Sequence, residues 1–271
     1  MKTKPFGYEQ AILENKKFSR FIVSLFGESH FGIRARQIWL SRMFQKHLSS
    51  TTKNILDAGC GKGHTSFWLA KYCPAASVEG IDINLKELEH CLSIQTALKL
   101  HNVTFQKSDI IGFSSFKKYD FILCVDVLEH IENWQQSIQS LMELLNSKGV
   151  LLIHLPHSGK YQEDHYGFRK FQRNKPLPQS PFEGMGHVRE GLAAEDFDFL
   201  KNVPGFEVII RYTFGDFTML SHTLFELYRS RSRFFRFLFN PILLFVTWME
   251  SRQCHDSLKD GGGILIEIRR N

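Results

Sequence analysis

Three glycines and a carboxylate stand close together early in the sequence. In ILDAGCGKGHTSFWLA, residues 55–70, Asp57 ends a run of strand-forming residues, and Gly59, Gly61 and Gly63 follow on alternate positions before a helical segment. Glycine accepts positive φ and has no side chain to keep a ligand from the backbone, and the first N–H groups of a helix attract anions. The stretch therefore predicts a strand–turn–helix unit whose main chain binds a ligand.

Three classes of ligand use turns of this kind. A phosphate-binding P-loop needs G-x-x-x-x-G-K-[ST], but Leu56 stands where its first glycine should be and Gly63 follows Lys62. A dinucleotide turn needs G-x-G-x-x-G, whereas this chain has G-x-G-x-G with an acidic residue two positions earlier. The third class, S-adenosylmethionine, fits the pattern better.

On these residues the stretch resembles motif I of the class I S-adenosylmethionine-dependent methyltransferases, and in particular the methyltransferase type 11 group. The resemblance continues in order to about residue 155, through GIDIN, FQKSDI and YDFILCVDVLEHI. It implies that Asp82 accepts hydrogen bonds from the ribose hydroxyls and that Asp109 lies near the adenine. Taken singly, each carboxylate could instead cap a turn. The implied cofactor-binding residues are Asp57, Gly59, Cys60, Gly61, Gly63, Asp82, Ile83, Asp109, Ile110 and Asp126.

The elements that must position these residues alternate between short apolar runs and helical stretches. Such alternation is typical of a parallel sheet built from βαβ units. We expect strands near 53–58, 77–82, 102–107, 119–125 and 148–154. Helices are expected near 63–72, 84–99 and 132–146, with Gly149 ending the last. Two further strands, near 206–213 and 263–269, complete a Rossmann-like seven-stranded sheet flanked by helices, the last strand being antiparallel as the resemblance implies.

The chain divides into three predicted parts. Residues 1–50 form a helical N-terminal cap in which Gly27 and Gly32 separate two helices, and residues 51–155 form the cofactor-binding core. Residues 156–271 hold the last two strands and two substrate-facing insertions, near 156–190 and 217–258. The cap and the insertions are expected to form a lid over the substrate pocket.

Methyl transfer from a sulfonium is an in-line displacement, so the protein must align the reactants and exclude water. An oxygen acceptor also needs a base or a metal ion to remove its proton. His130, His157 and His187 lie at or after the ends of the fourth and fifth strands and are the candidate catalytic residues. The alternative is that these histidines only order their loops.

A metal site is a weaker alternative. Asp126, Glu129, His130 and His187 resemble the set with which ubiquinone-pathway O-methyltransferases and small-RNA 2′-O-methyltransferases hold a divalent ion. Those families generally have Glu where this chain has Asp126, and the shorter side chain reaches less far. We therefore predict no metal and keep the four residues as the alternative.

The segment LYRSRSRFFRFLFNPILLFVTWMESR, residues 227–252, interleaves arginines with phenylalanines. Such a segment suits an anionic membrane surface or single-stranded nucleic acid, or it packs as an ordinary helical cap. Peripheral membrane contact through 229–249 is the partner considered. Nucleic acid is not expected, because the net charge is only +6 and the other basic clusters are separated.

The predicted activity is methyl transfer to an acceptor atom, oxygen in the first instance, of a small molecule, quinone-like compound, lipid or glycan. A silent cofactor-binding partner subunit and an RNA methyltransferase are the alternatives. The five cysteines form no C-x-x-C pair, and the N-terminus has no apolar signal region. The longest apolar stretch falls short of the roughly 20 residues that span a bilayer. We expect a cytoplasmic protein, with peripheral contact at the inner membrane face as the alternative.

Overall fold

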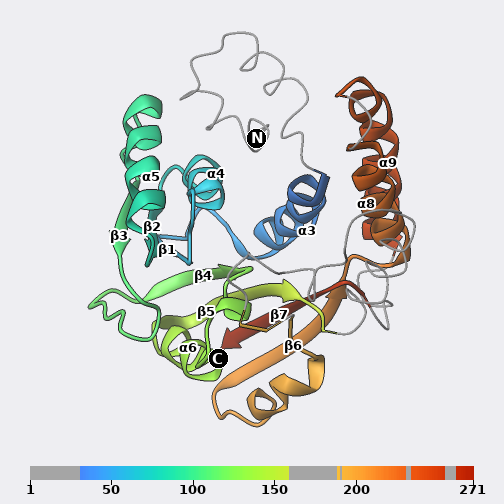
Figure 1. Cartoon of the computed structure of the whole chain (residues 1–271). Helices are drawn as coiled ribbons and strands as arrows, with labels where there is room; N and C mark the ends of the chain where they lie inside the picture. Colours follow the sequence, from blue (N-terminus) through green and yellow to red (C-terminus); the bar gives the residue numbers. More distant parts are fainter. Residues whose placement is uncertain (1–30, 159–187, 190, 230–232, 254–260) are drawn as a thin grey trace.

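A seven-stranded mixed sheet forms the centre of the molecule (Figure 1). The computed structural model describes residues 31–158, 188–189, 191–229, 233–253 and 261–271. The strand order is β3-β2-β1-β4-β5-β7-β6. The strands are β1 (Asn54–Ala58), β2 (Ser77–Asp82), β3 (Val103–Lys107), β4 (Tyr119–Val125), β5 (Leu145–Pro156), β6 (Phe206–Thr213) and β7 (Gly263–Arg270). The Rossmann-like sheet predicted from the sequence is confirmed.

The first five strands run parallel, and β7 is antiparallel to both of its neighbours. Since β5 and β6 each pair antiparallel with β7, they run in the same direction. The carboxyl ends of β1 to β6 therefore lie at one edge of the sheet. In open α/β sheets, ligands bind outside this edge.

Helices cover both faces of the sheet. On one face, the core joins the apolar sides of α3, α4 and α5 to the strands, with Phe44, Phe67 and Cys91 fully buried. On the other face, α6 and the 3-10 turn η2 contribute Ile138 and Phe197. The helices are α3 (Phe31–His47), α4 (His64–Tyr72), α5 (Leu85–Leu98), α6 (Trp134–Glu143), α8 (Asp216–Arg229) and α9 (Arg233–Gln253), with 3-10 turns η1 (Leu128–His130) and η2 (Ala194–Leu200).

Two glycine assignments from the sequence were wrong. Helix α6 ends at Glu143, and Gly149 lies inside β5, where a Cβ atom would come within 2.8 Å of the Tyr119 carbonyl oxygen. The pairing of β4 with β5 shifts register at this point, so Gly149 permits a bulge rather than a helix stop. Gly32 likewise lies in the first turn of α3 and not between two helices. The rest of the predicted N-terminal cap, residues 1–30, lies outside the described residues.

Helix α3 is anchored to the sheet by Glu267, a carboxylate on β7 with no exposed surface. Lys46 and His47, at the end of α3, approach its oxygens to 2.9 and 3.1 Å, and Arg211 does so from β6 at 2.9 Å. Burial acts to raise the pKa of Glu267, but hydrogen bonds from His47 and Lys46 outweigh it and hold the pKa well below its usual range. The C-terminal end of α3 is thus fixed over the sheet.

Helices α8 and α9 pack against each other and against α3, beside the carboxyl edge of the sheet (Figure 1). Phe31, Ala35, Phe225 and Leu243 form a small buried core among them. No helix within the described residues has the length and hydropathy required to cross a membrane.

The ion pairs around Glu267 predict that its substitution lowers the stability of the fold. Glu267→Gln removes the buried carboxylate that Lys46, Arg211 and Arg269 share, so we expect a loss of about 3 kcal/mol in the free energy of unfolding at pH 7. The difference from wild type should shrink as the pH falls below about 4, because the depressed pKa stabilises only where the carboxylate is ionised. Urea denaturation measures both. Glu207→Gln, whose side chain is 53% exposed, is the matched control and should cost under about 1 kcal/mol; equal losses in the two variants would contradict the prediction.

Candidate active site

The predicted glycine turn is present at the carboxyl end of β1. Gly59, Gly61 and Gly63 have φ of 76°, 48° and 70°, in the left-handed region that side chains disfavour. A Cβ atom on Gly59 would collide with Val127 beyond β4, and one on Gly63 would come within 2.8 Å of the Cys91 sulfur. Around Gly61 there is open space. The glycines therefore let the turn lie against its neighbours while one position stays bare.

The sequence predicted that the amides of this turn bind a ligand, but most of them donate to groups of the protein. Gly59 and Cys60 both donate to the Ile81 carbonyl, at 2.8 and 2.9 Å, and Gly63 donates to the Cys60 carbonyl at 2.8 Å. Gly61 donates to a carboxylate oxygen of Asp82 at 2.8 Å. Three of these N–H groups hold the turn on β2, and the fourth bond, from Gly63 to Cys60, lies within the turn. The first turn of α4, where His64 and Thr65 line a cleft, is therefore the main chain that we consider for an anion.

The carboxyl ends of β2 and β3 continue the site. Asp82 accepts the Gly61 and Asn84 amides, both at 2.8 Å, and Ile83 beside it is 69% exposed, an apolar surface left open to solvent. Asp109 follows β3, is exposed and accepts the Ile111 amide at 3.0 Å. Ile110 is buried in the core, so only its backbone can face a ligand.

A cleft of about 150 Å³ lies between the glycine turn and α3. Asp57 faces it with 3% of its surface exposed, and accepts a hydrogen bond from the Ser66 hydroxyl at 2.6 Å. Burial, assisted by the charge of Asp82, raises the pKa of Asp57 to about 6. A ligand cation in the cleft would lower this pKa again.

The opposite wall of the cleft carries Arg36 from α3. Its guanidinium forms an ion pair with Asp126, which follows β4 in the left-handed conformation at φ 53°. The second Asp126 oxygen contacts His154 Nδ1 at 3.2 Å, and His154 Nε2 contacts the Thr213 hydroxyl at 3.0 Å. Asp126, predicted as a cofactor contact, thus lies in a chain of polar groups that joins α3, β4, β5 and β6.

Arg36 and Arg189 were missed by the sequence analysis. For Arg36 the only signal was the helical periodicity of its segment. Arg189, in HVREG, donates to the Leu128 carbonyl at 2.7 Å, and the Val188 and Arg189 amides both donate to the Glu129 carbonyl. These bonds hold the end of the insertion near 156–190 against η1.

Glu129 is 1% exposed within η1. Burial and the nearby charge of Asp126 raise its pKa to about 8, although Arg36 and Arg189 act in the opposite direction. The protonated form is therefore favoured at neutral pH.

The three candidate histidines have different surroundings. His130 is exposed at the end of η1. His157, just after β5, places Nδ1 2.9 Å from the Gly261 carbonyl and its ring against Tyr212. His187 lies outside the described residues. The hydrogen bond to Gly261 thus fixes the ring of His157 at the carboxyl edge of the sheet.

The alternative metal set is not assembled by its described members. Asp126 is paired with Arg36 and His154, Glu129 is buried with a raised pKa, and His130 is exposed. Within the described residues, no three His, Cys, Asp or Glu side chains form a group suited to a metal ion.

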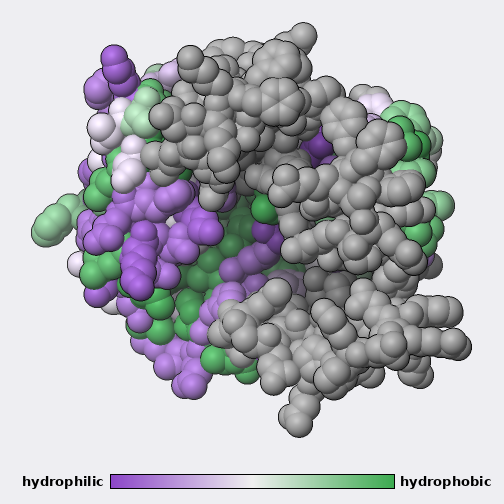
Figure 2. All heavy atoms as spheres, turned by 45° about the horizontal axis from the view of Figure 1, so that its top comes forward, coloured by the Kyte–Doolittle hydropathy of each residue, from purple (hydrophilic) through white to green (hydrophobic). Residues whose placement is uncertain are grey.

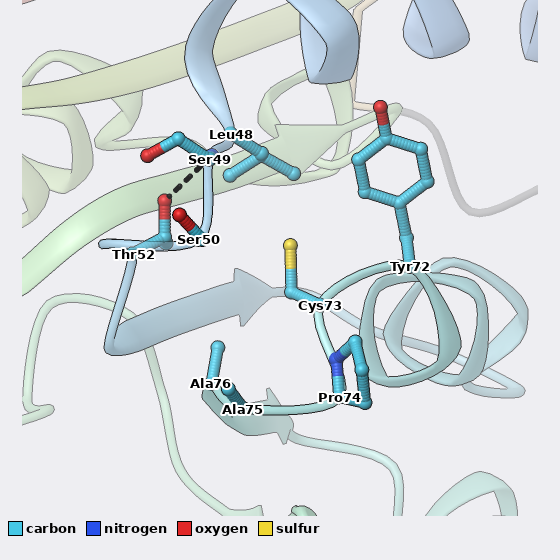
Figure 3. A pocket seen from close by; sticks show the side chains of 9 residues that line it. All are labelled: Leu48, Ser49, Ser50, Thr52, Tyr72, Cys73, Pro74, Ala75 and Ala76. Atoms are coloured by element: carbon cyan, nitrogen blue, oxygen red, sulfur yellow. Dashed lines mark hydrogen bonds between the residues drawn. The ribbon is translucent and has the colours of Figure 1, made fainter. Parts of the chain in front are cut away.

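A second cavity, of about 380 Å³, lies at the opposite edge of the sheet (Figure 3). Its walls are the connection from α3 to β1 and the connection from α4 to β2, including Ser49, Thr52 and Tyr72. This cavity faces the amino ends of the strands and does not belong to the site at the carboxyl edge.

The family model of a methyltransferase domain matches residues 49–180. This part of the chain is a class I methyltransferase domain. The match begins just before β1 and contains the glycine turn, Asp82, Asp109 and Asp126. The resemblance stated from the sequence motifs is confirmed.

Relatives of the methyltransferase domain act on different acceptors. The chain is 26% identical over 166 residues to a malonyl-[acyl-carrier protein] O-methyltransferase of Bacillus cereus, covering 61% of this chain and 60% of that enzyme. It is 29% identical over 150 residues to a ubiquinone biosynthesis O-methyltransferase of Rickettsia conorii, covering 54% and 50%. An (S)-coclaurine N-methyltransferase of Papaver somniferum is 26% identical over 106 residues, covering 39% and 30%. The chain thus spans at most 60% of the length of these relatives.

The fold of the domain also matches solved structures. The plantazolicin methyltransferase BpumL, in complex with a triazolic desmethylPZN analog and SAH, superposes with a TM-score of 0.56 at 22% identity, over 97% of this chain and 94% of that one. At this identity the likeness establishes the fold.

The raised pKa of Glu129 predicts a pH-dependent stability. The folded state holds a proton on Glu129 between about pH 4.5 and about 8, where the unfolded state does not, so stability falls as the pH rises through this window. Glu129→Gln cannot ionise, so its stability relative to wild type should rise by up to about 1.4 kcal/mol per pH unit across the window. Thermal unfolding at pH 5 and pH 8 measures this. Glu132→Gln, at an exposed neighbouring residue, is the control. If the difference in stability between Glu129→Gln and the wild type is the same at pH 5 and pH 8, the raised pKa of Glu129 is contradicted.

Proposed function

We propose that this protein is an S-adenosylmethionine-dependent methyltransferase that transfers the methyl group to an oxygen of a small-molecule, quinone-like, lipid or glycan acceptor. The observation that supports the proposal best is the glycine turn at the carboxyl end of β1, held on β2 through Asp82 and facing a cleft under α3. The two O-methyltransferase relatives favour oxygen as the acceptor atom.

The residues around the cleft fit the cofactor chemically. Its amino-acid end carries a carboxylate and an ammonium group, and the cleft offers a cation, Arg36, opposite a buried carboxylate, Asp57. Arg36 has five N–H donors and can bind a ligand while it remains paired with Asp126. The cleft is too small for the whole cofactor, so the sugar and base would extend along Asp82, the exposed Ile83 and Asp109.

When bound, the cofactor supplies a methyl group that its positive sulfur already activates. The chain's own task is then to hold the reactants in line and to keep water out. Helix α3 covers one side of the cleft, and the ion pairs of Arg36 and Glu267 fix it there. The paired Asp126 and His154 keep the ends of β4 and β5 in a fixed relation to that helix.

His157 is the base that we assign for the acceptor proton. Its Nδ1 donates to the Gly261 carbonyl, so in the neutral ring the lone pair is on Nε2, the nitrogen that can take up a proton. His154 is less suited, because both of its ring nitrogens contact protein groups and burial lowers its pKa.

Incubation of the protein with methyl-labelled cofactor and a fractionated cell extract tests the activity. Label is expected in the small-molecule, lipid or glycan pool. Label in RNA would contradict the acceptor class, and S-adenosylhomocysteine binding without label in any pool would favour a silent partner subunit.

Cofactor binding is tested at Asp82. Asp82→Asn removes the charge that holds the Gly61 amide, and S-adenosylhomocysteine affinity should fall by roughly 10- to 100-fold in calorimetry. Asp120→Asn is the matched control, since Asp120 also accepts two backbone amides, those of Lys53 and Asn54, but at the other edge of the sheet. Unchanged affinity in Asp82→Asn, or an equal loss in both variants, would count against the site.

The proposed role of His157 as a base predicts that its substitution lowers the rate of methyl transfer but does not change cofactor binding. Once the acceptor is identified, His157→Gln should lower kcat by about 100-fold and leave S-adenosylhomocysteine affinity unchanged. His130→Gln, on the exposed ring, is expected to retain activity. Full activity of His157→Gln over the whole pH range would show that another group takes the proton.

A further inference from the structure

The outer face of the α8–α9 helical pair is apolar. Between residues 238 and 249 of α9, every exposed side chain is apolar, and α8 adds Phe217 and Leu220, which are 60% and 55% exposed. The exposed residues of this part of α9 are Leu238, Pro241, Ile242, Phe245, Trp248 and Met249. Figure 2 shows apolar surface at the right margin, where Figure 1 places these helices. A contiguous apolar surface of this kind marks a binding face.

Most of the buried side chains of the same pair are polar, although Met219, Phe225 and Leu243 are buried as well. Glu250 of α9 is 5% exposed and accepts the Phe217 and Thr218 amides, both at 3.1 Å, as well as the Thr218 hydroxyl. Further buried polar residues are Ser221, Asn240, Thr247 and Ser251. Helices on the surface of a water-soluble protein place polar groups outward. This pair has the arrangement found in lipid, where polar groups pair between helices and apolar side chains face outward.

The exposed residues of α9 also follow one line. Leu238, Ile242, Phe245 and Met249 are spaced by four, three and four residues, so they form a stripe about 16 Å long on one side of the helix. Within the described residues no helix could span a bilayer, so contact in the plane of the membrane is the form that fits.

The basic residues that precede the stripe in the sequence select the kind of membrane. Arg229, Arg231, Arg233 and Arg236 follow one another where α8 ends and α9 begins, with no acidic residue between them. Each basic residue near an anionic lipid surface adds to the attraction. In the sequence, four positive charges thus directly precede the apolar residues of the stripe, a composition that suits an anionic bilayer.

We propose that the outer face of α8 and α9 docks on an anionic lipid bilayer, with both helices lying in the plane of the membrane. Helix α8 starts at the carboxyl end of β6, and α9 packs on α3, which carries Arg36. Docking would therefore bring the edge of the sheet that holds the candidate site close to the membrane. The proposal does not depend on methyl transfer, because lipid binding is measured without cofactor or acceptor.

Vesicle co-sedimentation tests the surface. The full chain should sediment with vesicles of equal parts phosphatidylglycerol and phosphatidylcholine at low salt and less with pure phosphatidylcholine. Ile242→Asp/Phe245→Asp should weaken binding at least ~10-fold, because two exposed apolar side chains are lost from the contact. Phe116→Asp is the matched control: Phe116 is a fully exposed aromatic residue between β3 and β4, and its variant should bind like wild type. Circular dichroism checks that the variants fold.

Trp248 gives a direct readout of insertion. It is 40% exposed, whereas Trp39, Trp68 and Trp134 are at most 8% exposed. Brominated acyl chains should therefore quench the fluorescence of the wild type on anionic vesicles. Trp248→Phe should still bind but show little quenching.

Three results would overturn the proposal. The first is recovery of the wild type in the supernatant with anionic vesicles at low salt. The second is equal vesicle binding by the wild type and the Ile242→Asp/Phe245→Asp variant. The third is a wild-type dimer in sedimentation velocity that the double substitution converts to a monomer, while neither protein binds vesicles. This last result would assign the face to a second copy of the chain.

Discussion

Close approach of backbone to side chains around the β1–α4 turn is the constraint on which the candidate site depends. Gly59 lies so near Val127, and Gly63 so near Cys91, that no other residue fits at either position without displacing its neighbours. These contacts place the turn against the residues after β4 and against α5. The Gly61 amide then reaches the Asp82 carboxylate, which ties the turn to the strand on which the sugar of the cofactor is proposed to lie.

Helix α3 completes the site through two carboxylates of the sheet. Arg36, near its start, pairs with Asp126 after β4, and Lys46 and His47, at its end, pair with the buried Glu267 of β7. Removal of the partners of the buried Glu267 leaves a charge with poor solvation, so this contact specifies where the helix lies more than it adds net stability. The cleft under α3 exists because the helix is held at both ends.

Much of the fold could be predicted from the sequence because it depends on local signals. Alternating apolar runs and helical stretches, with turn residues between them, predicted the strands, and the family resemblance implied that the last strand is antiparallel. The glycine turn and the carboxylates at the strand ends were predicted for the same reason. The prediction that Gly149 ends a helix was wrong. In the sequence, a glycine that permits a bulge cannot be distinguished from one that ends a helix until the partner strand is placed.

The parts that could not be predicted depend on contacts between distant segments. Arg36 reaches Asp126, and His154 reaches Thr213, only after the sheet has assembled. The amides of Gly59, Cys60 and Gly61 donate to groups of the protein, which the spacing of the glycines could not reveal. The spacing shows where the backbone is free to turn, but not in which direction its N–H groups point. The raised pKa values of Asp57 and Glu129 follow from burial and charges that the sequence does not place.

The central claim is that the cleft between the glycine turn and α3 receives the amino-acid end of the cofactor. A crystal structure of the full chain grown with S-adenosylhomocysteine tests this most directly. The account predicts density for the amino-acid end between Arg36, Asp57 and the first turn of α4, with the sugar on Asp82. Density for the compound at any other place, or an unliganded cleft at saturating concentration, would contradict it.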